Sequence, residues 1–480
     1  MMQDHDFLFC EMPVHRAVLS LAAPTVISQI ITVLYNMADT FFIGQLNDPN
    51  QVAAATVSMP AFVALTAFSN LFGIGGAGKI ARSLGKNDAE TAKRTAAFSI
   101  WTAAAAALLY GVAVFLARPW LLPVLGTNAE TYGSCASYVF WTISIGAVPT
   151  VLNSELAHLI RAEGYARQAG FGVAFGGVLN IALDPLFIFG LRMEIRGAAV
   201  ATMLSNTAAM AYFALFLYRI RNKTVITPNP KYYTLAGGVP CEVVIGGFPS
   251  FMMMLLGCLS NSILNRLVTA CSNEAMAGMG IAKKIDMIAF SVAQGMTQGV
   301  LPLIAYNYAS GNRKRMSQSV RLTLIYTLLM ACTATLTLFL FASPITRCFI
   351  RNDETVAYGR DFLKVICFTC PSTAVNFMII TVFQATKQRI QPLVLSLLRK
   401  GSLDIPLMII LNHSFGVRGI AWAAPLADWT ALIVSVLLFI PFHHKISGEY
   451  GTGADCLTGK GREALCTPEK SSGVNQGERQ

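Results

Sequence analysis

Residues 17–38 read AVLSLAAPTVISQIITVLYNMA, a stretch without a single charged side chain. A helix of about 20 such residues is long enough to cross the hydrocarbon core of a bilayer. Comparable blocks, nearly free of charge, recur at residues 95–117, 198–218 and 320–342. This pattern predicts an all-α integral membrane protein.

The composition favours the same class. Of the 480 residues, 54% are hydrophobic and only 13% are charged, whereas soluble proteins carry about 25% charged residues. The mean hydropathy is +0.54. The net charge is +11, but the basic residues lie in short loops between apolar blocks and form no stripe interleaved with aromatic residues. We therefore expect the lipid bilayer, and not a nucleic acid, as the partner.

We count about twelve candidate spans, and the basic residues predict their orientation. A bacterial cell inner (cytoplasmic) membrane protein that is multi-pass, with both termini in the cytoplasm, fits this pattern. The acidic residues before residue 12 do not resemble the n-region of a signal peptide, so we expect the first helix to stay in the protein. The loops after the second, sixth and eighth spans carry the basic residues Arg82, Lys86, Lys93 and Arg94; Arg219, Arg221, Lys223 and Lys231; and Arg313, Lys314 and Arg315.

The two halves of the chain repeat each other. Pro24 and Asn36 return as Pro249 and Asn261, each 225 residues later, and RGAAVA at residues 196–201 returns as RGIAWA at 418–423. Asn153 matches Asn376, and Asp184 matches Asp404. Two six-helix lobes of equal topology are expected to be related by a pseudo-two-fold axis along the membrane normal, and carriers built this way bind substrate between the lobes.

The repeat gives the expected domain boundaries. Residues 1–218 form the N-lobe with spans one to six, and residues 219–241 form a cytoplasmic linker between the lobes. Residues 242–442 form the C-lobe with spans seven to twelve, and residues 443–480 form a polar C-terminal tail.

Acidic residues lie within or close to several apolar spans, namely Asp39, Glu155, Asp184, Asp404 and Asp428. An intramembrane carboxylate is costly, and an ion or proton pathway is its usual explanation. Burial favours the neutral form of a carboxyl group, so that such a group can exchange a proton near neutral pH. The alternative is structural: each carboxylate hydrogen-bonds a neighbouring helix. Whether Asp404 and Asp428 take part is left open, and Asp286 is expected to pair locally with the preceding lysines.

Helical spacing groups some of these side chains. Tyr35 and Asp39 are four residues apart on the first span, as are Asn180 and Asp184 on the fifth, so each pair shares a helix face. Together the two pairs can make a small cage for a cation.

Other chemistries lack support in the sequence. The eleven cysteines are scattered and the six histidines form no metal spacing, so no metal site is expected beyond a possible Na⁺ at Asp39 and Asp184. No GxxxxGK[ST] motif is present, so we expect no cofactor, no ATP-driven motor and no ATPase subunit. No catalytic cluster points to an enzyme.

The sequence resembles the multidrug and toxic compound extrusion family from about residue 15 to 442. The segments that carry the resemblance are PT at 24–25, YNMAD at 35–39, RAEG at 161–164, LNIALDPL at 179–186, GAAVAT at 197–202, IAKKID at 281–286 and YNY at 306–308. The resemblance implies two six-helix lobes in a V shape that work by alternating access and export cationic or amphipathic compounds against a proton or sodium gradient.

The resemblance also implies site residues. The family's N-lobe cation site maps onto Asp39, Asn180, Asp184 and Thr202, with Tyr35 close by and Glu155 as a further candidate. Some members place an acidic site on the seventh and tenth spans, but here those spans carry no mid-membrane carboxylate, which favours the N-lobe. The residues expected to line the substrate cavity are Asn36, Asn153, Asn261, Asn265, Asn376 and Gln384.

These observations predict a secondary transporter: an antiporter, coupled to H⁺ or Na⁺, that exports small organic drugs or metabolites. A lipid-linked precursor flippase of the same superfamily is the main alternative, although it would line its cavity with several arginines and Arg266 is the one clear candidate. A membrane enzyme or channel is a more distant alternative.

Overall fold

The computed structural model describes residues 7–46, 48–350 and 352–453, without the side chains of residues 49, 273 and 443–453. The chain divides into two compact units after Ser435, and the architecture below is that of the first unit. The last helix runs on to Gly453 and so includes residues 443–453, which the sequence assigned to the polar tail. Residues 454–480 of that tail lie outside the described part.

The N-lobe is built from long helices joined by short turns. After a π-helical turn η1 (Phe7–Glu11), it contains α2 (Val14–Gly44), α3 (Pro49–Gly85), α4 (Ala89–Leu125), α5 (Tyr132–Val139), η2 (Phe140–Ile145), α6 (Ala147–Ala162), α7 (Ala166–Pro185), η3 (Leu186–Gly190) and α8 (Ile195–Arg219).

The C-lobe follows a linker that contains the short turn η4 (Pro230–Tyr232). Its elements are α9 (Val239–Thr269), α10 (Asn273–Ala309), α11 (Arg313–Leu340), α12 (Ala342–Phe349), α13 (Asp353–Ile366), α14 (Thr369–Ala385), α15 (Gln391–Leu397), η5 (Leu398–Ser402) and α16 (Asp404–Gly453).

The helices account for about twelve spans. Ten helical segments in the described residues are long and apolar enough to cross a membrane, and the pair 132–145 and 147–162, bent by 51°, makes one more. The longest segment, 391–442, holds two spans, because Gly416 interrupts it with φ 62° and ψ −150°. A side chain is strained at such a positive φ, which is why a glycine suits this turn.

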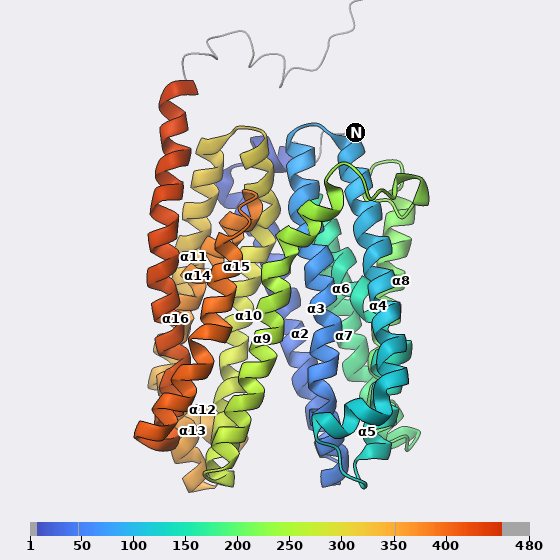
Figure 1. Cartoon of the computed structure of the whole chain (residues 1–480), viewed down its shortest axis with the longest axis vertical. Coiled ribbons are helices and arrows are strands. Elements are labelled where there is room, and N and C mark those ends of the chain that lie inside the picture. Colours follow the sequence, from blue (N-terminus) through green and yellow to red (C-terminus); the bar gives the residue numbers. More distant parts are fainter. Residues whose placement is uncertain (1–6, 47, 351, 454–480) are drawn as a thin grey trace, which may run out of the picture. The chain divides into compact units, whose positions relative to one another are not determined.

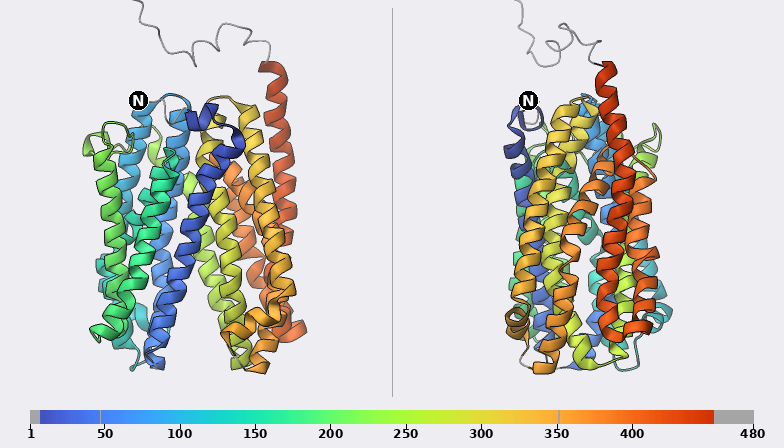
Figure 2. Two further views of the ribbon diagram at one scale, coloured as in Figure 1. Left: turned by 180° about the vertical axis from the view of Figure 1, so that it is seen from behind. Right: turned by 90° about the vertical axis from the view of Figure 1, so that its left-hand side faces the viewer.

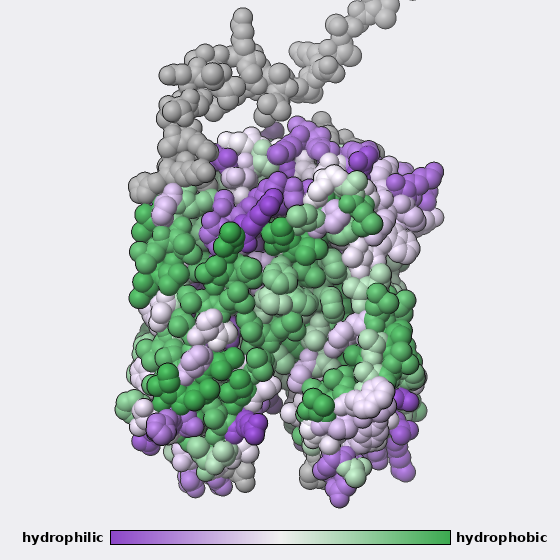
Figure 3. All heavy atoms as spheres, in the orientation of Figure 1, coloured by the Kyte–Doolittle hydropathy of each residue, from purple (hydrophilic) through white to green (hydrophobic). Residues whose placement is uncertain are grey.

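The two lobes are packed together at one end and separate toward the other (Figure 1, Figure 2). The space-filling view shows an apolar band across the middle of this face and a hollow between the lobes at the lower end (Figure 3). An apolar band of this kind is the surface that lipid covers.

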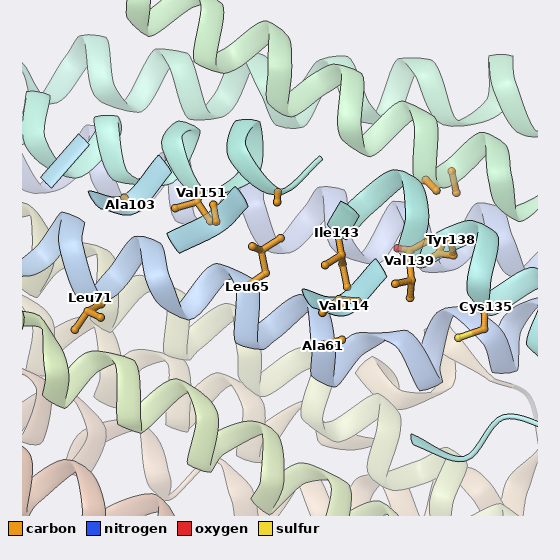
Figure 4. Packing of buried hydrophobic residues seen from close by; sticks show 14 of the residues in the cluster. Ala61, Leu65, Leu71, Ala103, Val114, Cys135, Tyr138, Val139, Ile143 and Val151 are labelled. Carbon is orange, nitrogen blue, oxygen red and sulfur yellow. The ribbon is translucent and has the colours of Figure 1, made fainter. Parts of the chain in front are cut away.

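Close helix contacts join the lobes in a reciprocal way: α2 packs on α10, and α9 packs on α3. Glycines permit the α3–α9 contact, since a Cβ at Gly247 would collide with the carbonyl of Leu71, and one at Gly75 with that of Val243. Small residues at helix crossings are the usual means by which membrane helices approach closely. The N-lobe core, part of which Figure 4 shows, therefore also takes in Val239 and Val243 of α9.

Charged side chains fasten the closed end. Glu242 of α9 forms ion pairs with two residues of α3, Lys79 at 3.2 Å and Arg82 at 3.7 Å. It forms a third with Lys387 of its own lobe at 2.7 Å. Arg82 Nη1 also donates to the backbone carbonyls of Gln384 and Ala385 at 3.2 and 3.3 Å. This set of contacts, which we call the interlobe latch, ties the end of α3 to the C-lobe.

The beginning of the chain adds to the same closure. Arg315 of α11 donates through Nε to Phe9 O at 2.6 Å and through Nη2 to Met12 O at 2.6 Å. The ring of Phe9 stacks on Tyr306 of α10 with 4.9 Å between ring centroids. The residues that precede α2 are thus bound to the C-lobe.

Glu163, just beyond α6, holds the linker. Its carboxylate accepts hydrogen bonds from the Thr224 hydroxyl and from Val225 N, the latter at 2.8 Å. Burial raises the pKa of the Glu163 carboxyl from 4.5 to about 7, although both donors act in the opposite direction.

The glycine contact predicts a difference between two substitutions on α9. Gly247→Ala should lower the melting temperature of the purified protein, because overpacking a close contact costs about 1–3 kcal/mol. Gly257→Ala is the control: no heavy atom lies within 4 Å of its Cβ position, and alanine favours a helix by about 1 kcal/mol over glycine. Equal melting temperatures for the two variants would contradict the packing argument.

The Glu163 carboxyl predicts a pH dependence of stability. Between pH 4.5 and 7 the folded protein holds a proton that the unfolded chain has released, so the free energy of unfolding falls as pH rises through this window. The fall amounts to at most ~3 kcal/mol. Thermal unfolding from pH 4.5 to 8 should show this component in wild type but not in Glu163→Gln. Glu90→Gln, an exposed change in α4, should retain it.

Candidate functional site

The end of α7 brings two of the predicted residues together. Asp184 has no exposed surface and lies next to Pro185, where α7 gives way to the π-helical turn η3. Asn180, one turn earlier, donates through Nδ2 to Asp184 Oδ1 at 3.3 Å and to Thr202 Oγ1 on α8 at 3.4 Å. The other oxygens, Asp184 Oδ2 and Asn180 Oδ1, are buried without a partner.

Helix α2 supplies the remaining members of this N-lobe site. It packs on α7 so closely that a Cβ at Gly177 would lie 3.0 Å from Cδ1 of Tyr35. Asp39 interacts electrostatically with Asp184 and with Tyr35, and its Oδ1 is buried without a partner. Among the described residues, no basic side chain forms an ion pair with either aspartate.

Tyr138 of α5 is a site residue that the sequence did not reveal. It is buried in the N-lobe core (Figure 4) and interacts electrostatically with Asp39, Asp184 and Tyr35. No spacing links Tyr138 to the other three residues, so only the packing of α5 could bring it to them.

The N-lobe site therefore gathers several buried oxygen atoms that have no hydrogen-bond donor as a partner. Carboxylate, amide and hydroxyl oxygens are the ligands of hard cations, and the same carboxyls can take up protons. Two neighbouring carboxylates repel each other when both are ionised and unpaired. The arrangement is chemically suited to bind a monovalent cation or a proton.

Glu155 lies apart from this site. It has no exposed surface, and neither of its carboxyl oxygens has a partner. Its backbone faces Gly73 of α3, next to His158. The interactions that connect Asp39, Asp184 and Tyr138 do not extend to Glu155, so its role in cation binding stays a prediction.

The C-lobe holds the repeat counterpart of the N-lobe site with different chemistry. At the offset that relates Asp184 to Asp404, Asn180 corresponds to Lys400, and Tyr35 corresponds to Ser260 at the offset of 225. Asp404 Oδ2 accepts a hydrogen bond from Ser260 Oγ at 2.6 Å and forms an ion pair with Lys400 Nζ at 3.8 Å. The carboxylate that is unpaired in the N-lobe is thus paired here.

A second polar network also follows the repeat. In the N-lobe it is neutral: Asn153 Nδ2 donates to Asn206 Oδ1, and Asn206 Nδ2 to Thr150 Oγ1, both at 3.1 Å. In the C-lobe Asp428 stands at the place of Asn206 and accepts from Thr373 Oγ1 at 3.0 Å.

A buried arginine completes this C-lobe network. Arg399 donates to Asp428 through Nε at 2.6 Å and Nη2 at 3.0 Å, and Asn376 Nδ2 donates to Asp428 O at 3.0 Å.

The residues predicted to line a substrate cavity fall into two groups. Asn153, Asn376 and Gln384 are buried and bonded within their lobes; Gln384 Nε2, for example, donates to Ser250 Oγ at 2.9 Å. Asn261 and Asn265 of α9 are exposed, and Asn36 is half-buried with Nδ2 on Thr32 O. Substrate contact stays a prediction for each of these residues.

Two interpretations from the sequence were wrong. Asp286 was expected to form a local ion pair with Lys283 and Lys284, but within the described chain neither lysine lies at ion-pair distance from it. Lys283 interacts with it electrostatically, and Asp286 Oδ1 accepts from Thr369 Oγ1 at 3.4 Å. Arg266 was taken as the arginine near a span interior, but it is exposed near the end of α9, whereas Arg399 is 1% exposed. The signal for Arg399 was its place near the centre of the eleventh span.

Comparisons with known proteins agree with this architecture. The sequence model of the MatE family matches residues 24–186 and 249–410, more than half of the chain, and the two matches follow the internal repeat. The chain is 26% identical over 442 residues to the multidrug export protein MepA of Staphylococcus haemolyticus, covering 92% of this chain and 96% of that protein. The protein of the same name from Staphylococcus saprophyticus is 28% identical over 436 residues, with 90% and 95% covered.

Solved structures have the same fold. A crystal structure of MATE in complex with MaL6 superposes with a TM-score of 0.86 at 23% identity, covering 93% of this chain and 99% of that one. The outward-facing conformation of a multidrug resistance MATE family transporter gives a TM-score of 0.84 at 23% identity, with 93% and 98% covered.

The different pairing of the carboxylates predicts different effects on stability. Asp428→Asn leaves Arg399 as a buried charge without a counterion, which costs about 3–5 kcal/mol. Asp184→Asn removes a carboxyl that has no cationic partner, so the melting temperature should change little. The double variant Arg399→Gln, Asp428→Asn should recover part of the loss. Equal destabilisation by Asp184→Asn and Asp428→Asn would contradict the assignment of Asp428 to structure and Asp184 to ion binding.

Proposed function

The chain belongs to the MatE family of multidrug and toxic compound extrusion transporters, and from this premise we propose that it is a cation-coupled antiporter that exports organic molecules by alternating access. Proteins of this family are secondary transporters and not enzymes. The relatives named multidrug export proteins support drugs or metabolites, cationic or amphipathic, as the substrates. The coupling ion is H⁺ or Na⁺.

One observation above all supports this proposal: Asp39 and Asp184 lie within electrostatic reach of each other without a basic partner, in a lobe that must be embedded in lipid. A cation or proton relieves their repulsion, and Asn180 and Thr202 supply further oxygen atoms. The unneutralised carboxylates therefore favour cation binding in the present conformation.

Ion binding can be linked to the lobe movement through α2. This helix carries Asp39 at one end of its span and Pro24 in its interior, and it packs on α10 of the other lobe. An ion drives the cycle only through its different affinity for the two conformations. We propose that uptake of the ion changes the course of α2, and that this change favours release of the exported molecule.

The direction of transport follows from the charges. The closed end carries Lys79, Arg82 and Lys387 of the interlobe latch, and the basic loops predict that this end is cytoplasmic. Since Phe9 and Met12 contact the C-lobe at the same closed end, the hollow between the lobes opens to the outside of the inner membrane in this orientation (Figure 3). We propose that this is the outward-facing state, in which substrate leaves and the coupling ion enters.

The proposal predicts the behaviour of efflux from reconstituted vesicles under a pH gradient or a sodium gradient imposed separately. Wild type should respond to one of the two gradients, which identifies the ion, and Asp184→Asn should lose that response, because the site lacks one of its two carboxylates. Asp404→Asn is the matched control: its carboxylate already has Ser260 and Lys400 as partners, so gradient dependence should persist. Gradient-independent movement in wild type would sink the antiporter proposal and favour the flippase.

A further inference from the structure

The repeat places a positively charged counterpart opposite the N-lobe cation site. Where the N-lobe has Leu179 and Asn180, the C-lobe has Arg399 and Lys400, and Thr202 corresponds to Ala424. The N-lobe site has two carboxyls and no basic residue in ion-pairing contact. At these positions the C-lobe site lacks the oxygens of Asn180 and Thr202 and carries two cations.

A cavity of ≈ 30 Å³ lies at this C-lobe position. It is lined by residues of α10, α14, η5 and α16, all within one lobe. Three basic and two acidic side chains line it: Lys283, Arg399 and Lys400, and Asp286 and Asp428. Asp404 faces Lys400 from outside this lining.

The hydrogen bonds leave donors free at the cavity. Arg399 donates to Asp428 through Nε and Nη2, and Nη2 also donates to Thr373 Oγ1 at 2.7 Å. Its Nη1 is buried without a partner. Lys283 interacts electrostatically with Asp286 and Asp428, but within the described chain it has no carboxylate at ion-pair distance.

Three of the four carboxylate oxygens in the lining accept hydrogen bonds. Both oxygens of Asp428 accept from Arg399, and one also from Thr373. Asp286 Oδ1 accepts from Thr369. The guanidinium of Arg399 lies against the packed rings of Phe377 and Phe290, 4.9 Å from the centroid of the first and 5.8 Å from that of the second. Arg399 is 1% exposed and is held through Nε and Nη2, so its guanidinium is fixed at the cavity that it lines.

We propose that this cavity binds one small monovalent anionic group, which accepts hydrogen bonds from Arg399 Nη1 and Lys283 Nζ. The volume holds about one or two water-sized particles, which fits a halide ion or a carboxylate group and excludes a whole drug molecule. The anionic group could be supplied in two ways, as a free halide ion or as the carboxylate of an exported compound. Either one supplies an acceptor for Arg399 Nη1, which is buried without a partner among the described residues.

The site is tested with purified transporter equilibrated with ³⁶Cl⁻ in gluconate buffer of constant ionic strength. Wild type should bind chloride saturably, at one site per chain. Lys283→Gln should weaken binding about tenfold or more, because a charge-assisted hydrogen bond is lost. Lys284→Gln, the neighbouring exposed residue, is the control and should bind as wild type does. Absence of saturable binding, or equal binding by Lys283→Gln, would mean that only water occupies the cavity.

A second variant tests whether the Arg399 guanidinium binds the anion. Arg399→Gln alone leaves Asp428 as an unpaired buried charge, so the change is combined with Asp428→Asn, which keeps the net charge of the site unchanged. The double variant should keep its gel-filtration profile and lose chloride binding. Retention of binding would overturn the role of Arg399.

Efflux measurements separate the two sources. An amphipathic amine that carries a carboxylate is compared with its methyl ester, each in chloride and in gluconate. If the carboxylate of the substrate occupies the site, Lys283→Gln and chloride should both slow efflux of the acid and not of the ester. If free halide occupies it, both compounds should move faster in chloride. Efflux of both compounds unaffected by chloride and by Lys283→Gln would count against the site. These outcomes do not depend on which cation drives transport.

Discussion

A polar side chain inside a bilayer finds no water, so it must find its partner within the helix bundle. The C-lobe meets this requirement almost completely: Arg399 pairs with Asp428, and Asp404 with Ser260 and Lys400. The N-lobe leaves Asp39 and Asp184 without a cation. The same constraint thus leaves the C-lobe carboxylates paired within the protein, whereas the N-lobe has two carboxylates without a basic partner among the described residues, which is the basis of the proposed ion site.

The internal repeat makes this contrast visible. Thr150, Asn153 and Asn206 form a neutral network in the N-lobe, and their counterparts Thr373, Asn376 and Asp428 form one around a buried charge in the C-lobe. The backbone scaffold tolerates either, since helices satisfy their own backbone groups and leave the side chains to differ. Duplication therefore allowed the two lobes to take different charges without a change of fold.

The contact between the lobes has a different character. Glycine at positions such as Gly247 lets α9 and α3 touch backbone to backbone, and Glu242 fastens the closed end with Lys79 and Arg82. The contact also has an apolar part, because Val239 and Val243 of α9 belong to the N-lobe core. The proposed alternating access would require these contacts to rearrange.

The sequence alone determined the membrane class, the spans, the two-lobe repeat and the candidate acidic residues, because hydropathy, spacing and i,i+4 geometry are local properties of the chain. It predicted that Asn180 and Asp184 face the same way, and their hydrogen bond confirms this. The place of Tyr138, the pairing of Arg399 with Asp428 and the cavity beside Lys283 were decided only by tertiary structure, as was the separation of Glu155 from Asp39. Which buried charge finds a partner depends on how distant helices pack, and no local pattern carries that information.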